Sequence, residues 1–161
     1  MNRFLYLSIL ILALGLSCCS NNDPIYELTP TIEFISISPE EVEEFGPFVL
    51  ELSFQDGDGD LGGTSEGQST PFNLFLQDLR AGYPLPDGGF DGLFKYSLPD
   101  LTPDSRNPSI QGEIKIDLGD IGIIHPDSLK ESARFEIWIL DRAGNKSNVV
   151  VSEPLVINRP Q

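Results

Sequence analysis

The chain has 161 residues, of which 40% are apolar and 22% are charged, which is typical of one globular domain and excludes a large multidomain enzyme. Ten Lys and Arg residues stand against 25 Asp and Glu residues, so the formal net charge is −15. A surface of this sign repels phosphate backbones, and we therefore exclude nucleic acid from the expected partners.

The first residues have the pattern of an export signal. The sequence MNRFLYLSILILALGLS places Arg3 before an apolar run from Phe4 to Leu16, followed by the small Ser17. The apolar run is shorter than the ~20 residues that a membrane-spanning helix needs, so cleavage is favoured over a transmembrane anchor. We predict a signal peptide over residues 1–17.

The two cysteines of the chain follow this leader directly. The run L-G-L-S-C resembles a bacterial lipobox, whose cysteine is acylated and becomes the first mature residue, and Cys18 fits that pattern. Cys19 is the alternative register, and simple secretory cleavage beside a chance cysteine pair is the alternative interpretation. Several acyl chains on one residue hold a protein at a membrane almost permanently. Residues 18–30 then read as a polar stalk, and no cysteine is left for a disulfide in the domain.

Beyond the stalk, apolar residues recur with a period of two between clusters of Gly, Pro, Asp and Asn. This pattern predicts an all-β domain over residues 31–159, a seven-stranded antiparallel immunoglobulin-like β-sandwich without a core disulfide. Pro154 indicates an edge strand or a bulge in the last segment, because proline cannot donate to a ladder. The expected strands are 31–38, 47–55, 72–78, 93–98, 111–118, 133–141 and 148–157.

Alternation within three of these strands assigns the side chains that face inward. Trp138 and Phe75 fall on the outward face, where cross-strand packing or cover from a loop is favoured over a ligand platform. The expected core contains Phe48, Leu50, Leu52, Phe54, Ile114, Ile116, Leu118, Phe135, Ile137 and Ile139.

Two stretches do not have the strand pattern. Residues 79–92 are rich in turn residues and predict a long connection. Residues 119–132 contain H-P-D-S-L-K-E, in which Asp127 or Ser128 can cap one short helical turn. The only histidine of the chain, His125, lies there, and a surface or capping role is favoured over a general base.

The most informative motif follows the second predicted strand. Asp56, Asp58 and Asp60 alternate with glycines in D-G-D-G-D-L-G-G, and carboxylates this close repel one another unless a cation offsets them. Calcium takes about 6–8 hard oxygen ligands, and the motif offers none of the His or Cys ligands that zinc or copper prefer. An EF-hand is excluded because Leu61 and Gly67 stand where that loop requires Gly and Glu. We predict a structural Ca²⁺ site in a strand loop, with a solvated acidic turn as the alternative.

A second loop is expected at the same end of the sandwich. In a Greek-key arrangement, the loops after the second and the sixth strand emerge together. Asp141 ends the sixth predicted strand and Asn145 follows in the same turn, so both are candidate metal ligands beside the three aspartates. In the alternative interpretation, Asp141 and Asn145 only shape the hairpin, and Gly144 supplies a positive φ.

The turn I-L-D-R-A-G-N-K-S-N, residues 139–148, resembles the D-x-A-G-N-x-S signature that closes the last hairpin of many bacterial immunoglobulin-like domains. Together with the lipobox and D-G-D-G-D-L-G, the whole chain resembles small immunoglobulin-like lipoproteins of unassigned function from Bacteroidetes. The resemblance implies a lipid-anchored protein of the cell outer membrane, on its periplasmic or its surface side. D-S-L at residues 127–129 also resembles an O-glycosylation motif of the same group, so Ser128 is a candidate, with the helix cap as the alternative.

These observations predict a calcium-stabilised, lipid-anchored binding or assembly module rather than an enzyme. The expected partner is a glycan, a peptide or another envelope protein. Tyr83, Phe90, Phe94 and Tyr96 are candidate contact aromatics, and local packing is the favoured role for them. The alternatives are a small cell-envelope hydrolase, for which so small a sandwich offers little cleft, and a structural accessory subunit of an outer-membrane complex.

Overall fold

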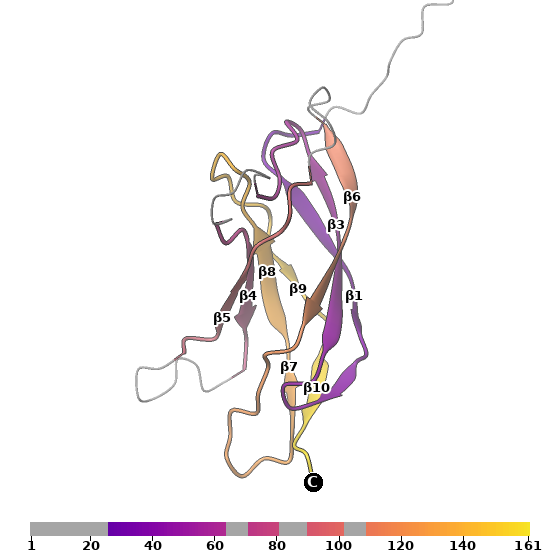
Figure 1. Ribbon diagram of the computed structural model, residues 1–161, viewed down its shortest axis with the longest axis vertical. Helices are drawn as coiled ribbons and strands as arrows, with labels where there is room; N and C mark the ends of the chain where they lie inside the picture. Colours follow the sequence, from indigo (N-terminus) through magenta and orange to yellow (C-terminus); the bar gives the residue numbers. More distant parts are fainter. Residues whose placement is uncertain (1–25, 64–70, 81–89, 102–108) are drawn as a thin grey trace, which may run out of the picture.

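The computed structural model describes four stretches of the chain, residues 26–63, 71–80, 90–101 and 109–161. The regular elements in these stretches are all β-strands (Figure 1). The predicted signal peptide, Cys18, Cys19 and Tyr83 lie outside the described residues. The strands are β1 (Thr31–Ser38), β2 (Glu41–Glu43), β3 (Phe48–Asp56), β4 (Leu74–Asp78), β5 (Leu93–Tyr96), β6 (Ile110–Leu118), β7 (Lys130–Ala133), β8 (Phe135–Ile139), β9 (Val150–Val151) and β10 (Leu155–Asn158).

The strands form three sheets. The first has the order β1-β3-β6, the second has the order β5-β4-β8-β9, and all strand pairs in both are antiparallel. The third sheet, β2-β10-β7, lies near the C-terminus and pairs β2 with β10 in parallel. An all-β fold built mainly of antiparallel sheets is therefore confirmed.

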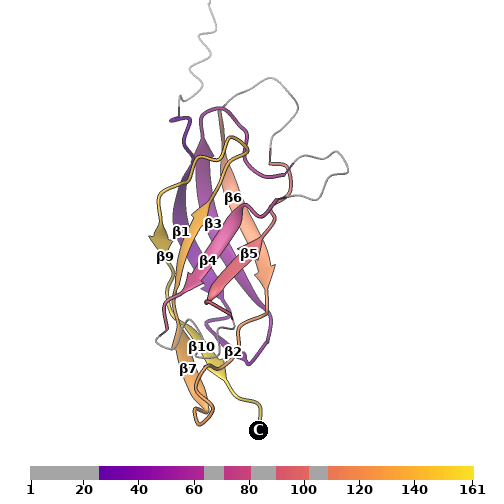
Figure 2. The same cartoon turned by 90° about the vertical axis from the view of Figure 1, so that its left-hand side faces the viewer.

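The hydrophobic core lies between the first and the second sheet. These sheets stand side by side in Figure 1 and one in front of the other in Figure 2, so they form two layers. Successive side chains of a strand point to opposite faces, and the buried faces of β3 and β8 supply Phe48, Leu50, Leu52, Phe54, Phe135, Ile137 and Ile139. Of the ten predicted core residues, Ile116 alone is half-buried and the others are buried.

The prediction of seven strands is wrong, because ten are described and the segment 148–157 is split between two sheets. β9 pairs with β8, whereas β10 pairs with β7 and β2. Ser152 lies at the switch, where its buried hydroxyl accepts from the N–H of Phe135 at 3.0 Å and donates to the carbonyl of Glu153 at 2.8 Å. Pro154 has no N–H for a ladder, so the chain leaves one sheet here and enters the other.

No helix is present among the described residues, and hence none long and apolar enough to cross a membrane. The short helical turn predicted near Asp127 and Ser128 is wrong. Instead, the N–H of Ser128 donates to the carbonyl of His125 at 3.0 Å, and the chain then enters β7. Pairing of β7 with β10 along its full length fixes Lys130–Ala133 as a strand, so long-range pairing overrides the local helical preference.

The outward aromatics Phe75 and Trp138 pack against each other across the β4–β8 pair. Their ring centroids are 5.5 Å apart and their planes differ by 6°. The ammonium nitrogen of Lys146 lies 4.1 Å from the centroid of the Trp138 ring, a cation–π contact. The cross-strand packing predicted for both aromatics is therefore confirmed.

Candidate metal site

The acidic loop and the turn after β8 meet at one end of the two main sheets. Asp56 is the last residue of β3 and begins the acidic loop. Leu61 and Asp141 form a β-bridge, and the N–H of Arg142 donates to the carbonyl of Asp60 at 3.1 Å. Two segments that lie far apart in the sequence therefore build one tip.

Three carboxylates converge at this tip. One oxygen from each of Asp56, Asp58 and Asp60 lies within 4.8 Å of the other two. Asp56 is fully buried, Asp60 is half-buried and Asp58 is exposed. The Oδ1 atoms of Asp56 and Asp60 are buried and accept no hydrogen bond from the described residues. Burying a negative oxygen without a donor is costly, so this geometry favours a bound cation.

The environment of Asp56 disfavours its charged form. Burial raises the pKa of Asp56 to about 6. The N–H of Asp60 acts in the opposite direction and lowers this pKa, because it donates to Oδ2 of Asp56 at 2.9 Å. The charges of Asp58, Asp60 and Asp141 raise the pKa of Asp56 further. Burial likewise raises the pKa of Asp60, together with the charges of Asp141 and Asp58. Without a counter-ion, these carboxylates stand close enough to repel one another.

Asp141 and Asn145 hold the opposing turn together. The backbone N–H and the side-chain Nδ2 of Asn145 donate to Oδ1 and Oδ2 of Asp141, both at 2.7 Å. Asp141 is buried, and the three-carboxylate group does not include it. These bonds suit the alternative role in which both residues shape the hairpin, and their role as metal ligands stays a prediction.

Arg142 fastens the tip in a way that sequence spacing did not indicate. Its guanidinium donates to the carbonyls of Gly59 at 3.4 Å and Leu61 at 3.5 Å, and to a carboxylate oxygen of Asp100 at 3.3 Å. The N–H of Ala143, the next residue, donates to Oδ2 of Asp60 at 3.0 Å. The turn thus supplies hydrogen-bond donors to the acidic loop. These contacts could not be predicted from sequence spacing, because they depend on the pairing of two segments that lie far apart in the chain.

The end of the predicted stalk also touches the acidic loop. Tyr26 donates its hydroxyl to Oε1 of Gln111 at 2.6 Å. Gly57 packs so closely on the backbone of Tyr26 and Glu27 that a Cβ atom there would overlap both carbonyl oxygens. The motif therefore needs glycine at this position for close approach of a second backbone segment.

Two glycines of the tip allow a matched test of its packing. Gly62 and Gly144 have φ values of 85° and 90°, but a Cβ on Gly62 would overlap the carbonyl of Pro99, whereas a Cβ on Gly144 would meet open space. We expect Gly144→Ala to destabilise the fold by about 1 kcal/mol through backbone strain alone. Gly62→Ala should cost about 2–4 kcal/mol, because overpacking adds to the strain. Equal costs in chemical denaturation would show that the contact with Pro99 is not tight.

The donor set at the tip fits a hard divalent cation. Carboxylates and backbone carbonyls are the ligands that calcium prefers, and calcium tolerates irregular coordination better than the smaller Mg²⁺. The cluster contains no His or Cys side chain. The buried, unsatisfied oxygens of Asp56 and Asp60 are the atoms that a cation would neutralise.

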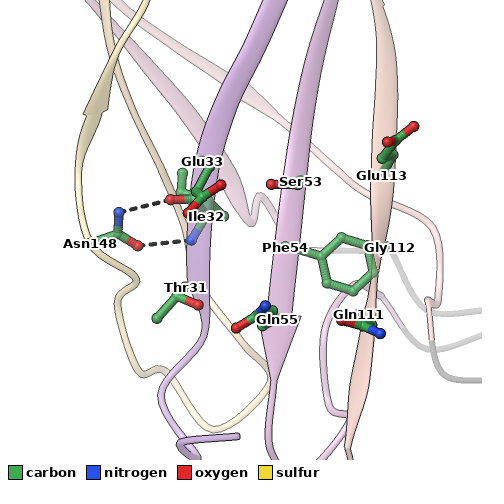
Figure 3. A pocket seen from close by; sticks show the side chains of 10 residues that line it. All are labelled: Thr31, Ile32, Glu33, Ser53, Phe54, Gln55, Gln111, Gly112, Glu113 and Asn148. Atoms are coloured by element: carbon green, nitrogen blue, oxygen red, sulfur yellow. Dashed lines mark hydrogen bonds between the residues drawn. The ribbon is translucent and has the colours of Figure 1, made fainter. Parts of the chain in front are cut away.

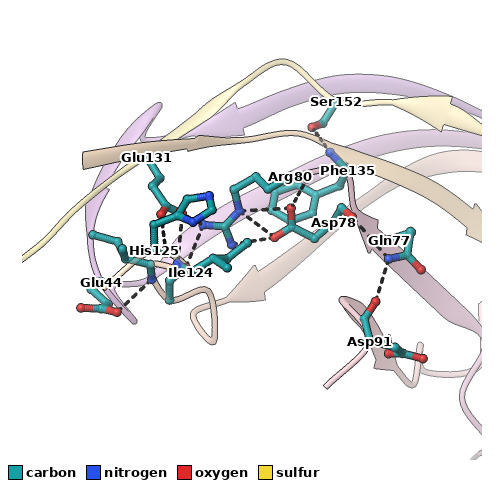
Figure 4. A network of polar contacts seen from close by, with 12 residues as sticks. Glu44, Gln77, Asp78, Arg80, Asp91, Ile124, His125, Glu131, Phe135 and Ser152 are labelled. Atoms are coloured by element: carbon teal, nitrogen blue, oxygen red, sulfur yellow. Dashed lines mark hydrogen bonds and ion pairs between the residues drawn. The ribbon is translucent and has the colours of Figure 1, made fainter. Parts of the chain in front are cut away.

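A second polar cluster lies around Asp78, the last residue of β4, at the end of the strand away from the aspartate tip. Figure 4 shows its side chains. The guanidinium of Arg80 pairs with Asp78 at 2.6 Å and with Glu131 at 2.7 Å, and all three side chains are at least nine-tenths buried. Burial acts to raise the pKa of Glu131, but the N–H groups of Ile124 and His125, with Arg80, outweigh burial and lower it. The cluster therefore ties the loop before β7 to the second sheet.

The remaining predicted residues lie around this loop. His125 is exposed and lines a small cavity of about 240 Å³ with Arg80, Glu131 and Ser132. Ser128 is half-buried, and Leu129 beside it is 72% exposed. The glycosylation of Ser128 stays a prediction.

A larger cavity, of about 550 Å³, opens on the first sheet (Figure 3). At its edge, the Asn148 side chain accepts from the N–H of Ile32 and donates to the carbonyl of Ile32, both at 2.8 Å, and so takes the place of a neighbouring strand on β1. The sequence pattern does not indicate this cavity, because its walls come from three paired strands. Its polar lining is Thr31, Glu33, Ser53, Gln55, Gln111 and Glu113.

Comparison of the chain with protein-family models, with curated proteins and with solved structures found no match. The resemblance to immunoglobulin-like lipoproteins of Bacteroidetes therefore stays a prediction that depends on the motifs themselves.

Proposed function

We propose that this protein is a calcium-stabilised binding or assembly module, tethered to the cell outer membrane through lipid on Cys18. The observation that carries the metal part of the proposal is Asp56, a fully buried carboxylate with one unsatisfied oxygen beside two further aspartates. A divalent cation offsets both the burial and the mutual repulsion of these groups. We infer a structural role for the ion, because the loop that carries the three aspartates is bridged to the turn after β8 through Leu61 and Asp141.

The fold that we propose is a sandwich of the immunoglobulin type. Two antiparallel sheets pack face to face, and the loops after β3 and after β8 meet at one end, as a Greek key requires. The D-R-A-G-N-K-S-N turn closes the hairpin between β8 and β9. In this proposal β2, β7 and β10 form an extension of the seven-stranded plan.

The membrane part of the proposal depends on the leader and the two cysteines. L-G-L-S-C supports acylation at Cys18, with Cys19 as the second register. Tyr26 already contacts the domain, so the tether between the lipid and the folded part is short. Partners at the envelope are therefore met by a domain held close to the membrane surface.

The metal proposal is tested by thermal unfolding of the full chain in detergent, with Ca²⁺ or with a chelator. Calcium at a hundredfold excess over its dissociation constant stabilises a protein by about 2.7 kcal/mol, which corresponds to roughly 10 °C in Tm for a domain of this size. We expect this shift in the wild type and its loss in Asp58→Ala. Asp117→Ala removes the same charge from an exposed position of β6 and should keep the shift. An equal Tm in Ca²⁺ and chelator would contradict the proposal.

A further inference from the structure

A second concave site lies along β5, at the edge of the second sheet. β5 pairs only with β4 in the described part of the chain, so its other edge carries no partner strand there. A cavity of about 350 Å³ opens beside this edge. Its lining combines the rings of Phe72, Phe90, Phe94 and Tyr96 with the carboxylates of Asp91 and Asp120.

The aromatic rings are held by the core on one side and reach solvent on the other. Phe94 packs edge-to-face on the buried Phe135 ring, with centroids 6.5 Å apart, and on Phe90, with centroids 4.7 Å apart. Phe72 is 58% exposed and Phe90 is 40% exposed. Large aromatic surface beside a cavity is typical of a recognition site rather than of solvent-facing sheet.

Three polar groups of the cavity can accept hydrogen bonds. Asp91 and Asp120 are both exposed carboxylates. The hydroxyl oxygen of Tyr96 is buried and has no hydrogen-bond partner among the described residues. Burial, together with the charge of Asp120, raises the pKa of Tyr96 to about 12, so the phenol is neutral at physiological pH and its oxygen can accept from an N–H group.

We propose that this cavity binds a basic side chain, the ammonium of lysine or the guanidinium of arginine, presented by an extended segment of a partner protein. Aromatic faces attract cations through their quadrupole, and carboxylates form charge-assisted hydrogen bonds with N–H donors. The net charge of −15 also draws a basic segment toward the protein.

A protein segment fits the cavity better than the amine of a lipid headgroup. An extended segment can use the backbone groups along the edge of β5 that pairs with no described strand, which a headgroup cannot. A headgroup would also bring its phosphate toward Asp91 and Asp120, which repel it. The inference names a ligand for the binding function proposed above, at a site separate from the aspartate tip.

Among the described residues of the lining, Lys95 is the only one with a cationic side chain, so changing it tests whether the ligand is a cation or an anion. It is exposed and pairs with Phe75, whereas Phe94 and Tyr96 pair with the buried Leu76 and Leu74, so alternation places Lys95 on the opposite face of β5. If the ligand is a cation, removing this charge strengthens binding. If the ligand is an anion, removing it weakens binding.

The test is an NMR titration of the full chain, purified in detergent with Ca²⁺, that follows backbone signals of Leu93–Tyr96. The probe is acetyl-Val-Lys-Val-amide, compared with the same peptide carrying Nε-acetyl-lysine, which keeps the shape and loses the charge. We expect the acetylated peptide to bind at least fivefold more weakly. Asp120→Asn and Phe90→Ala should each weaken binding of the charged peptide about twofold to fivefold, and Lys95→Met should strengthen it by a similar factor.

Asp117→Asn is the matched control, because it removes an exposed charge from β6 outside the cavity and should leave the affinity unchanged. Equal binding of the two peptides, weaker binding by Lys95→Met, or tighter binding of glycerophosphoethanolamine than of the charged peptide would each overturn the proposal. The Tm shift with Ca²⁺ is measured on the same samples, so a failure here is distinguishable from a failure of the metal site.

Discussion

Replacing Asp56 with asparagine is expected to have opposite effects with and without calcium. In a chelator, Asp56→Asn should stabilise the fold by up to about 3 kcal/mol at neutral pH, because it removes a buried charge whose pKa is raised from 3.8 to about 6. In Ca²⁺, the variant should lose most of the stabilisation that the ion supplies, because one carboxylate ligand is gone. Urea unfolding under both conditions measures the two effects.

The pH dependence follows from the direction of the shift. Between pH 3.8 and about 6, folded metal-free protein keeps the Asp56 proton that the unfolded chain has released. Stability from this group is therefore present at low pH and is lost as the pH rises through about 6. The difference in unfolding free energy between wild type and Asp56→Asn in chelator should grow over this range and level off above it.

Two outcomes would contradict this account of Asp56. A variant that keeps the full Ca²⁺ effect would remove Asp56 from the ligand set. A variant that is less stable than wild type in chelator at pH 7 would mean that the carboxylate is satisfied in the metal-free fold.

Asp78→Ala is expected to be the most damaging substitution away from the tip. Asp78 is fully buried and accepts from Nε of Arg80 at 3.1 and 3.0 Å and from Nη2 at 2.6 Å. Removing one partner of a buried ion pair costs about 3–5 kcal/mol. Here the guanidinium of Arg80 would stay buried after losing one of its carboxylate partners. The loss should appear as a drop in Tm of roughly 10 °C or more, with or without Ca²⁺.

Lys130→Ala supplies the control for this prediction. Lys130 and Glu41 also form an ion pair, at 3.0 Å, but both side chains are more than half exposed. Water already solvates both charges there, so the substitution should cost less than about 1 kcal/mol. Similar losses in the two variants would show that burial does not set the strength of the Arg80 cluster.

Strand positions were predictable wherever one face of a strand is buried. The predicted bounds of β1 agree with the observed ones, and those of β3 and β6 agree within one residue at each end. The reason is that neighbouring residues alternate between apolar and polar side chains where one face of a strand is buried. β2 and β7 escaped prediction because E-V-E and K-E-S-A have little apolar contrast. Their strand form depends on pairing with β10, a partner far away in the sequence.

The candidate metal site was predictable in its residue types and not in its contacts. Asp56, Asp58 and Asp60 could be selected from spacing alone, and the structure brings them together. The hydrogen bonds within the turn of Asp141 and Asn145 and the contacts of Arg142 could not be inferred, because they depend on how two loops meet.

The sequence by itself determined the alternating strands and the acidic loop, and it predicts an export signal, since each depends on residues within a few positions of one another. The tertiary structure alone decided which oxygens of the aspartates are buried without donors, and which aromatics share a cavity with Asp120. The physical reason is that desolvation and convergence are properties of segments that pack together. Those segments are joined here by strand pairing over long stretches of chain.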